Sequence, residues 1–188
     1  LPAVLERYQV LGVMDNGQIA DTSYSVAWQT TKEEEVKTGA KKLLASRGQR
    51  IVLGEQIYLD IIYPNSVPNG KDTNDGSIVA KLNYGKISFL LTGDSTIKAE
   101  NVLLASGHDL ESEVLKVGHH GSKTSSGPKY VASIKPKYAI ISAGKDNRYG
   151  HPHVTTIETL TTAGAKILQT AEEGTIVCES DGGVVNCQ

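Results

Sequence analysis

The chain has 188 residues, of which 39% are hydrophobic and 21% are charged, and its formal net charge is −2 at pH 7. This composition suits one domain with a buried core and excludes a long disordered or low-complexity chain. No apolar run approaches the ~20 residues of a membrane-spanning helix, and the small negative charge provides no overall attraction for nucleic acid. We therefore expect a single α/β domain over residues 1–188.

The first third of the chain is predicted to contain two helices and three strands. Apolar residues at helical spacing predict a helix over residues 1–8 and a longer helix from Tyr24 to about Ser46, with Ser23 as its N-cap. Short apolar runs predict strands over 10–14, 50–53 and 56–63.

A polar loop over 65–76 follows, which we expect to border the functional site or to serve only as a connection. Beyond it, strands are predicted over 77–84, 86–91, 114–117, 137–142, 166–169 and 175–179. Helices are predicted between them over 96–105, 128–133 and 154–163. This alternation of strands and helices indicates a layered α/β fold.

Three apolar runs in this second part are followed directly by polar side chains. The three stretches are Phe89–Asp94, Val114–His120 and Tyr138–Pro152. If the strands are parallel, their ends meet at one edge of the sheet, where α/β folds place their sites. A carboxylate and a neutral imidazole are ligands that Zn²⁺, Fe²⁺ or Mn²⁺ accepts. Asp94 and the His119-His120 pair are therefore candidate metal ligands, although Asp94 could instead only cap the next helix.

These motifs, in this order, resemble the metallo-β-lactamase-like domain of ComEC-type competence proteins. The resemblance rests on Leu-Leu-Thr-Gly-Asp (90–94), Leu-Lys-Val-Gly-His-His-Gly-Ser-Lys-Thr-Ser (115–125) and Asn-Arg-Tyr-Gly-His-Pro (147–152), and it extends over nearly the whole chain. It implies an αββα sandwich with two divalent ions, Zn or Mn, in the intact domain. It also implies hydrolysis of a phosphodiester by metal-activated water.

The resemblance implies a role for several individual residues. Asp94 would be the bridging carboxylate ligand, and His120, rather than His119, the last metal ligand, with His119 in a supporting position. His151 and Arg148 would contact phosphate oxygens or protonate the leaving group. Phosphate or substrate would bind to Ser122, Lys123, Thr124, Ser125, Asn147 and Tyr149. Hydroxyl groups in such a loop also bond to their own backbone, which is the alternative for the serines and threonine.

One element of the family pattern is missing from this sequence. The family's His-x-His-x-Asp-His motif does not occur, and no histidine precedes His108. Residues 1–8 resemble the helix that follows that motif, so we expect an N-terminally truncated domain comprising about its last three-quarters. We expect such a chain to bind metal weakly or not at all, to be inactive alone, and to self-associate through uncovered sheet edges.

The leading interpretation is a phosphodiesterase or nuclease-like hydrolase associated with DNA uptake, at the cell surface or outside the cell. Its partners would be DNA or another phosphodiester and a membrane channel domain of the parent protein. Seven Lys or Arg against three Asp or Glu over residues 110–153 fit a phosphate-binding rim, or ordinary surface charge. The alternatives are a secreted metallo-phosphodiesterase acting on a small or cell-wall substrate, and a non-catalytic folding or binding fragment.

The two cysteines, Cys178 and Cys187, flank a predicted hairpin turn. A two-residue turn at Gly182-Gly183 places them opposite each other and permits a disulfide, whereas a turn at Asp181-Gly182 offsets them. Disulfides persist in oxidising compartments, so a bond would favour an extracellular location. Two free thiols in a cytosolic chain are the alternative.

Overall fold

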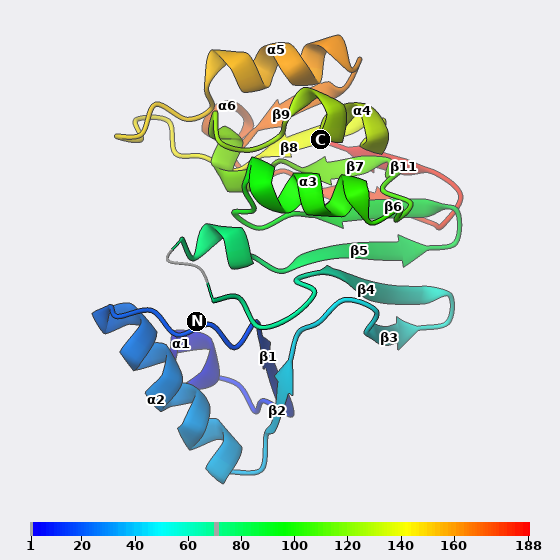
Figure 1. Ribbon diagram of the computed structural model, residues 1–188. Helices are drawn as coiled ribbons and strands as arrows, with labels where there is room; N and C mark the ends of the chain where they lie inside the picture. Colours follow the sequence, from blue (N-terminus) through cyan, green and yellow to red (C-terminus); the bar gives the residue numbers. More distant parts are fainter. Residues whose placement is uncertain (1, 70–71) are drawn as a thin grey trace.

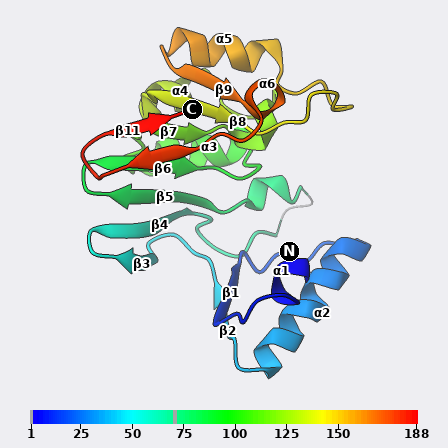
Figure 2. The same cartoon turned by 180° about the vertical axis from the view of Figure 1, so that it is seen from behind.

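The computed structural model describes residues 2–69 and 72–188, and a seven-stranded mixed sheet lies at its centre (Figures 1 and 2). In spatial order the strands are β3 (Arg50–Gly54), β4 (Ile57–Tyr63), β5 (Val79–Tyr84), β6 (Ile87–Leu91), β7 (Val114–Lys116), β8 (Tyr138–Ile141) and β9 (Lys166–Gln169). Strands β3 to β6 pair antiparallel, and β6 to β9 pair parallel. The carboxyl ends of β6 to β9 therefore lie at one edge of the sheet.

Three helices cover one face of this sheet: α3 (Ile97–Ala105), α4 (Pro128–Ile134) and α5 (Val154–Thr162) (Figure 1). They form the main hydrophobic core with the parallel strands. Its fully buried members include Leu90, Leu103, Leu115, Val131, Ile134, Ala139, Ile141 and Leu160. The short apolar runs β6 to β8 are buried because helices and a hairpin cover their two faces, as is usual for parallel strands.

The opposite face of β6 to β9 is covered by a hairpin of β10 (Cys178–Ser180) and β11 (Val185–Cys187) (Figure 2). The buried residues of this contact are Ile87, Val114, Tyr138 and Leu168 from the sheet and Val185 and Cys187 from the hairpin. Cys178 pairs with Cys187 across the hairpin, and the two form a disulfide. Val177 and Gln188 exchange both backbone hydrogen bonds, so the cysteines occupy the adjacent non-hydrogen-bonded pair, where side chains approach most closely. The register with the turn centred on Gly182-Gly183 is thus confirmed.

The N-terminal part lies at the other end of the long sheet from α5 (Figure 1). It contains α1 (Pro2–Leu5), β1 (Gly12–Asp15), α2 (Ser23–Lys37) and β2 (Lys41–Leu44), with β1 and β2 paired parallel in a small separate sheet. Met14 packs against a third core cluster, which consists of Ala45, Ile61 and Ala80. This cluster attaches the small sheet to β4 and β5.

The predicted helix from Tyr24 to about Ser46 is wrong in its second half. The helix α2 ends at Lys37, and residues 41–44 form the strand β2. Gly39 adopts a φ of +113°, which glycine reaches at low cost, and the chain turns there to run beside β1. The N-cap is Thr22 rather than Ser23, since the Thr22 hydroxyl accepts a hydrogen bond from the Ser25 N–H at 3.1 Å.

Three other predicted elements differ from the structure. The helix predicted over 1–8 is confined to α1, and Leu1 lies outside the described residues. The strand predicted over 175–179 begins only at Cys178, and a short helix, α6 (Thr170–Glu173), precedes it without having been predicted. The predicted loop over 65–76 ends in a 3₁₀ turn, η1 (Asn74–Gly76), and includes residues 70 and 71, which lie outside the described part.

The predicted fold class is confirmed, because helices and a central mixed sheet form an α/β structure. In the described residues, the second β layer of the expected αββα sandwich consists of the two small sheets, β1–β2 and β10–β11. In the same residues, no helix is both long enough and apolar enough to traverse a bilayer. A single domain over 1–188 stays a prediction.

A buried ion pair secures the N-terminal part. The Lys32 ammonium donates to the Asp15 carboxylate, and the side chains are only 2% and 15% exposed. Trp28 Nε1 donates to the same carboxylate at 3.1 Å. Burial raises the pKa of Asp15, but the hydrogen bonds from Lys32 and Trp28 outweigh it, so the pKa lies below its usual value.

We predict that Lys32→Ala lowers the free energy of unfolding by about 3–5 kcal/mol, because it leaves a buried carboxylate without its counter-charge. The control is Glu111→Gln, which removes one charge of the exposed Lys135–Glu111 pair and should cost less than about 1 kcal/mol. Urea denaturation of both variants measures the difference. Equal losses would contradict a stabilising role for the buried pair.

Candidate active site at the ends of the parallel strands

Polar side chains follow three of the parallel strands at the same edge of the sheet. Asp94 lies three residues after β6, His119 and His120 lie in the turn η2 (Gly118–Gly121) after β7, and Ser142 follows β8. The His119 N–H donates to the Gly93 carbonyl at 3.1 Å and so ties the first two strand ends together. As the sequence predicts, Asp94 and one histidine of the pair, His120, lie close together at this edge.

The two histidines occupy a strained turn. His119 has φ 47° and ψ 44°, and His120 has φ 57° and ψ 22°, so both are in the left-handed region that non-glycine residues seldom adopt. Such backbone costs on the order of 1–3 kcal/mol per residue and is concentrated at functional sites. The turn directs the imidazoles to different partners, His120 to Asp94 and His119 to Asn74.

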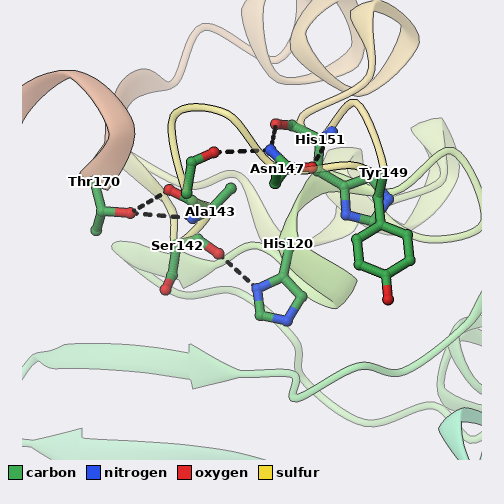
Figure 3. Close-up of a pocket in the computed structure, with 8 residues that line it drawn as sticks. His120, Ser142, Ala143, Asn147, Tyr149, His151 and Thr170 are labelled. Carbon is green, nitrogen blue, oxygen red and sulfur yellow. Dashed lines mark hydrogen bonds between the residues drawn. The ribbon is translucent and has the colours of Figure 1, made fainter.

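The tautomer of His120 is set by a backbone carbonyl. Its Nδ1 lies 2.5 Å from the Ser142 carbonyl oxygen, which can only accept, so Nδ1 carries the proton (Figure 3). In the neutral ring the free lone pair is then on Nε2, which lies 3.6 Å from Oδ1 of Asp94, longer than a hydrogen bond. A histidine held in this way by a carbonyl is the usual arrangement for metal ligands.

The Asp94–His120 pair fits a divalent metal as far as two ligands are concerned. Two ligands at about 2.0–2.2 Å from one tetrahedral ion lie about 3.4 Å apart, close to the observed separation. Across residues 2–69 and 72–188, however, no group of three or more His, Cys, Asp or Glu side chains is arranged to hold a metal ion. A complete catalytic site needs at least one further ligand, so we derive no chemical step through a metal from these residues.

His119 contacts residues other than Asp94. Its Nε2 lies 3.5 Å from the side-chain nitrogen of Asn74, and its Nδ1 lies 3.4 Å from the Thr124 hydroxyl. Asn74 belongs to η1, and the adjacent Asp75 ties η1 to the start of α3 by accepting from Thr96 Oγ1 at 2.5 Å. The polar loop thus borders the site, and Asn74 is a site residue that the sequence interpretation missed.

His151 and His153 bring two more imidazoles to the site. The His151 ring centroid lies 5.7 Å from that of His119, 6.5 Å from that of His120 and 5.3 Å from that of His153. Burial lowers the pKa of His151, and the neighbouring histidines lower it further, which favours the neutral imidazole. Reasoning from sequence had given no role to His153.

A close backbone approach joins the two histidine-bearing loops. The His153 N–H donates to the Gly121 carbonyl at 2.9 Å. Gly121 has φ +81°, and a Cβ on it would lie only 2.6 Å from Cβ of Pro152. Only glycine at position 121 allows residues 151–153 to pack against the His119-His120 turn.

The hydroxyl residues after the histidines differ in their availability to a substrate. Ser125 is buried, and its hydroxyl donates to the Gly118 carbonyl at 2.8 Å, so it serves its own loop and is not offered to phosphate. Ser122 is also buried and shares a hydrogen bond with the Thr124 hydroxyl at 3.0 Å. Thr124 and Lys123 are exposed, and Thr124 is next to His119. The structure therefore leaves Thr124 and Lys123 accessible, but not Ser125.

Glu100 supports this loop from α3. Its carboxylate accepts the Ser126 N–H at 2.5 Å and the Gly127 N–H at 2.9 Å, and the residue is only 2% exposed. Burial raises the pKa of Glu100 by more than these two hydrogen bonds lower it. Nothing in the sequence near Glu100 indicates this contact, because its partners are 26 and 27 residues away.

A cavity of about 450 Å³ opens beside His120, within the range of small-molecule sites (Figure 3). Residues that follow β7, β8 and β9 line it, including His120, Ser142, Asn147, Tyr149, His151 and Thr170. Asn147 is occupied by its own loop, since its side chain bonds the carbonyls of Gly144 and His151 and the His151 N–H. Arg148 is exposed at the loop tip, where it donates to the Tyr149 hydroxyl at 2.7 Å.

Similarity to a solved structure supports this fold. A solved structure from Parabacteroides distasonis, described as a metal-dependent hydrolase, superposes with a TM-score of 0.51 over 89% of this chain and 79% of that one, at 12% sequence identity. No family model matches the chain. The fold and the strand-end site define the class: the protein has a metal-dependent hydrolase fold of the metallo-β-lactamase-like type.

Sequence relatives narrow this class. ComE operon protein 3 of Bacillus subtilis is 33% identical over 87% of this chain, and Recombination protein 2 of Haemophilus influenzae is 35% identical over 64%. Competence protein ComA of Neisseria gonorrhoeae is 36% identical over 62%. The chain is a metallo-β-lactamase-like domain of the ComEC type. It spans 20%, 15% and 17%, respectively, of the length of these three relatives.

We predict that Gly121→Ala reduces stability by about 2 kcal/mol or more, since it combines an unfavourable positive φ with a collision against Pro152. The matched control is Gly164→Ala, where φ is +77° but no atom lies within 4 Å of the added Cβ. This control should lose only the stability that a positive φ costs an alanine, about 1 kcal/mol. Equal losses in thermal or urea unfolding would show that the Gly121–Pro152 packing contributes nothing.

We also predict a pH effect from Glu100. Because its folded-state pKa is raised above the ordinary value of 4.5, the folded protein holds this proton more tightly than the unfolded chain does. Its contribution to stability is therefore fully present below about pH 4.5 and is lost as the pH rises through the folded pKa.

Glu100→Gln should remove this part of the pH dependence, whereas Glu158→Gln, at an exposed position on α5, should retain it. Urea unfolding at several pH values between 4 and 8 measures the pH dependence of stability for the wild type and both variants. A Glu100→Gln profile parallel to that of the wild type would contradict the assignment.

Proposed function

We propose that the chain forms part of a metal-dependent phosphodiesterase or nuclease-like domain that acts in DNA uptake. The observation that carries this proposal is the Asp94–His120 pair, with Nδ1 of His120 held by the Ser142 carbonyl and Nε2 free at 3.6 Å from the carboxylate. The names of the relatives, two of which are competence or ComE operon proteins, support the biological context. When bound, a divalent ion, Zn or Mn, would supply Lewis acidity and activate water at neutral pH.

The residues around the pair are suited to binding a phosphodiester. Arg148 and Lys123 are exposed cations at the site, and an arginine can bind two phosphate oxygens at once. Thr124 offers a hydroxyl beside His119. His151 can donate a proton to the leaving oxygen when its ring is protonated, and its lowered pKa makes that proton easier to give up. In this proposal His151 and Arg148 therefore act on the leaving group, and Thr124 and Lys123 hold the phosphate.

The ligand set is proposed to be completed from outside this sequence. Asp94 and His120 provide two ligands, and the family's His-x-His-x-Asp-His motif would provide the others. The 188-residue chain alone would then bind metal weakly and hydrolyse nothing at the rate of the complete domain. The larger size of the relatives is compatible with a membrane channel domain in the same protein.

An extracellular or cell-surface location is part of the proposal. The disulfide between Cys178 and Cys187 supports it, because such bonds form and persist in oxidising compartments. Mass measurement with and without reductant tests this part separately.

The test of the function compares this chain with a longer one that carries the motif. Calorimetric titration with Mn²⁺ or Zn²⁺ should give weak binding for the short chain and about two ions for the long one. Asp94→Ala in the long chain should reduce cleavage of single-stranded DNA by on the order of a hundredfold or more. Glu55→Ala, at an exposed position in the turn between β3 and β4, is the control.

Two results would contradict the proposal. One is tight binding of two ions by the short chain, and the other is cleavage by the long chain that survives Asp94→Ala. Cleavage of a small phosphoryl ester in preference to DNA would favour the secreted phosphodiesterase, and no cleavage by either chain would favour a non-catalytic fragment.

A further inference from the structure

An exposed aromatic ring stands at the rim of the cavity beside His120. Tyr149 lines this cavity and is 61% exposed, and its ring stacks on that of His151 with centroids 5.7 Å apart and planes inclined by 23° (Figure 3). Single exposed apolar residues are common on protein surfaces and need no explanation. Tyr149 differs from them in two respects. Only the ring of His151 lies between its ring and that of His120, and its loop is held by hydrogen bonds.

The loop that carries Tyr149 is fixed by its own hydrogen bonds. The Asn147 side chain donates to the Gly144 carbonyl at 2.8 Å and to the His151 carbonyl at 2.6 Å, and its oxygen accepts the His151 N–H at 2.9 Å. Two of these bonds close the loop from residue 147 to residue 151, and the third ties residue 147 to residue 144. A tyrosine on such a loop has only two side-chain torsions to order, so binding a ring to it costs little conformational entropy.

The charge at this ring limits what it can bind. The Arg148 guanidinium donates to the Tyr149 hydroxyl at 2.7 Å, and its central carbon lies 4.9 Å from the ring centroid. A permanent cation there repels a quaternary ammonium group, which would otherwise be an attractive ligand for a tyrosine. The same cation attracts phosphate, and a neutral aromatic ring can stack beside it.

We infer that Tyr149 is a specificity-determining residue that stacks on an unpaired nucleobase, while Arg148 contacts the phosphate next to it. The inference rests on the proposed function and assigns its substrate class: a single-stranded nucleic acid rather than a small ester with a cationic head group. A paired base inside a duplex has no free face for the ring, whereas an unpaired base does. The rings of His120, His151 and Tyr149 follow one another, so a base stacked on Tyr149 would have a defined position relative to a phosphate attacked beside His120.

The test measures binding of a labelled dT₁₀ strand and of an abasic strand of equal length by fluorescence anisotropy, in EDTA to prevent cleavage. The wild-type 188-residue chain should bind dT₁₀ about tenfold more tightly than the abasic strand, because base–aromatic stacking contributes a factor of this order. Tyr149→Leu should lose that preference, and Tyr149→Phe should keep it. Tyr24→Leu, at an 88% exposed tyrosine on α2, is the matched control and should keep it too.

Two further readouts separate stacking from other effects. Tyr149→Leu should leave the melting temperature and the salt dependence of binding unchanged, whereas Arg148→Gln should reduce the salt dependence for both strands. Thymidine monophosphate should displace dT₁₀ more effectively than phosphocholine does.

Equal wild-type affinity for the two strands, or a base preference that survives Tyr149→Leu, would overturn the inference while leaving phosphate binding intact. More effective competition by phosphocholine would overturn it in favour of a small-ester substrate. Failure to bind either strand would overturn both the inference and the proposed function.

Discussion

The close approach of Gly121 to Pro152 is the constraint on which the candidate site depends. Parallel pairing of β6, β7 and β8 brings three strand ends to one edge, but it does not place the loops beyond them. The Gly121–Pro152 contact packs residues 151–153 against the His119-His120 turn and so adds His151, which neighbours both imidazoles of the turn, and His153, which neighbours His151. The same packing places His151 beside His120 in the lining of the cavity.

The electrostatics of the site follow from the same arrangement. Burial lowers the pKa of His151, and the neighbouring imidazoles lower it further because they disfavour a second positive charge nearby. The Ser142 carbonyl accepts the Nδ1 proton of His120 and leaves Nε2 as an acceptor toward Asp94. A neutral imidazole nitrogen beside a carboxylate is the form in which a histidine binds a metal.

The sequence predicted the features that depend on local pattern. Short apolar runs that stop at Asp94 and at His120 located the strand ends, and residue counting around the 182–183 turn paired Cys178 with Cys187. It failed where a distant contact decides the outcome. The sequence predicts β2 as a continuation of α2, because Leu43 and Leu44 also fit helical spacing and the pairing with β1 lies outside any local window. Asn74, Glu100 and Gly121 were missed for the same reason, since each acts through a partner at least 26 residues away.

The central claim is that His120, and not His119, presents a free Nε2 to a metal beside Asp94. Nitrogen-15 NMR of the histidine side chains at pH 8, with and without Zn²⁺, tests it most directly. The structure predicts that His120 carries its proton on Nδ1 and that added Zn²⁺ shifts its Nε2 resonance, with no such shift in Asp94→Ala. A proton on Nε2 of His120, or a zinc-induced shift at His119 that leaves His120 unchanged, would contradict it.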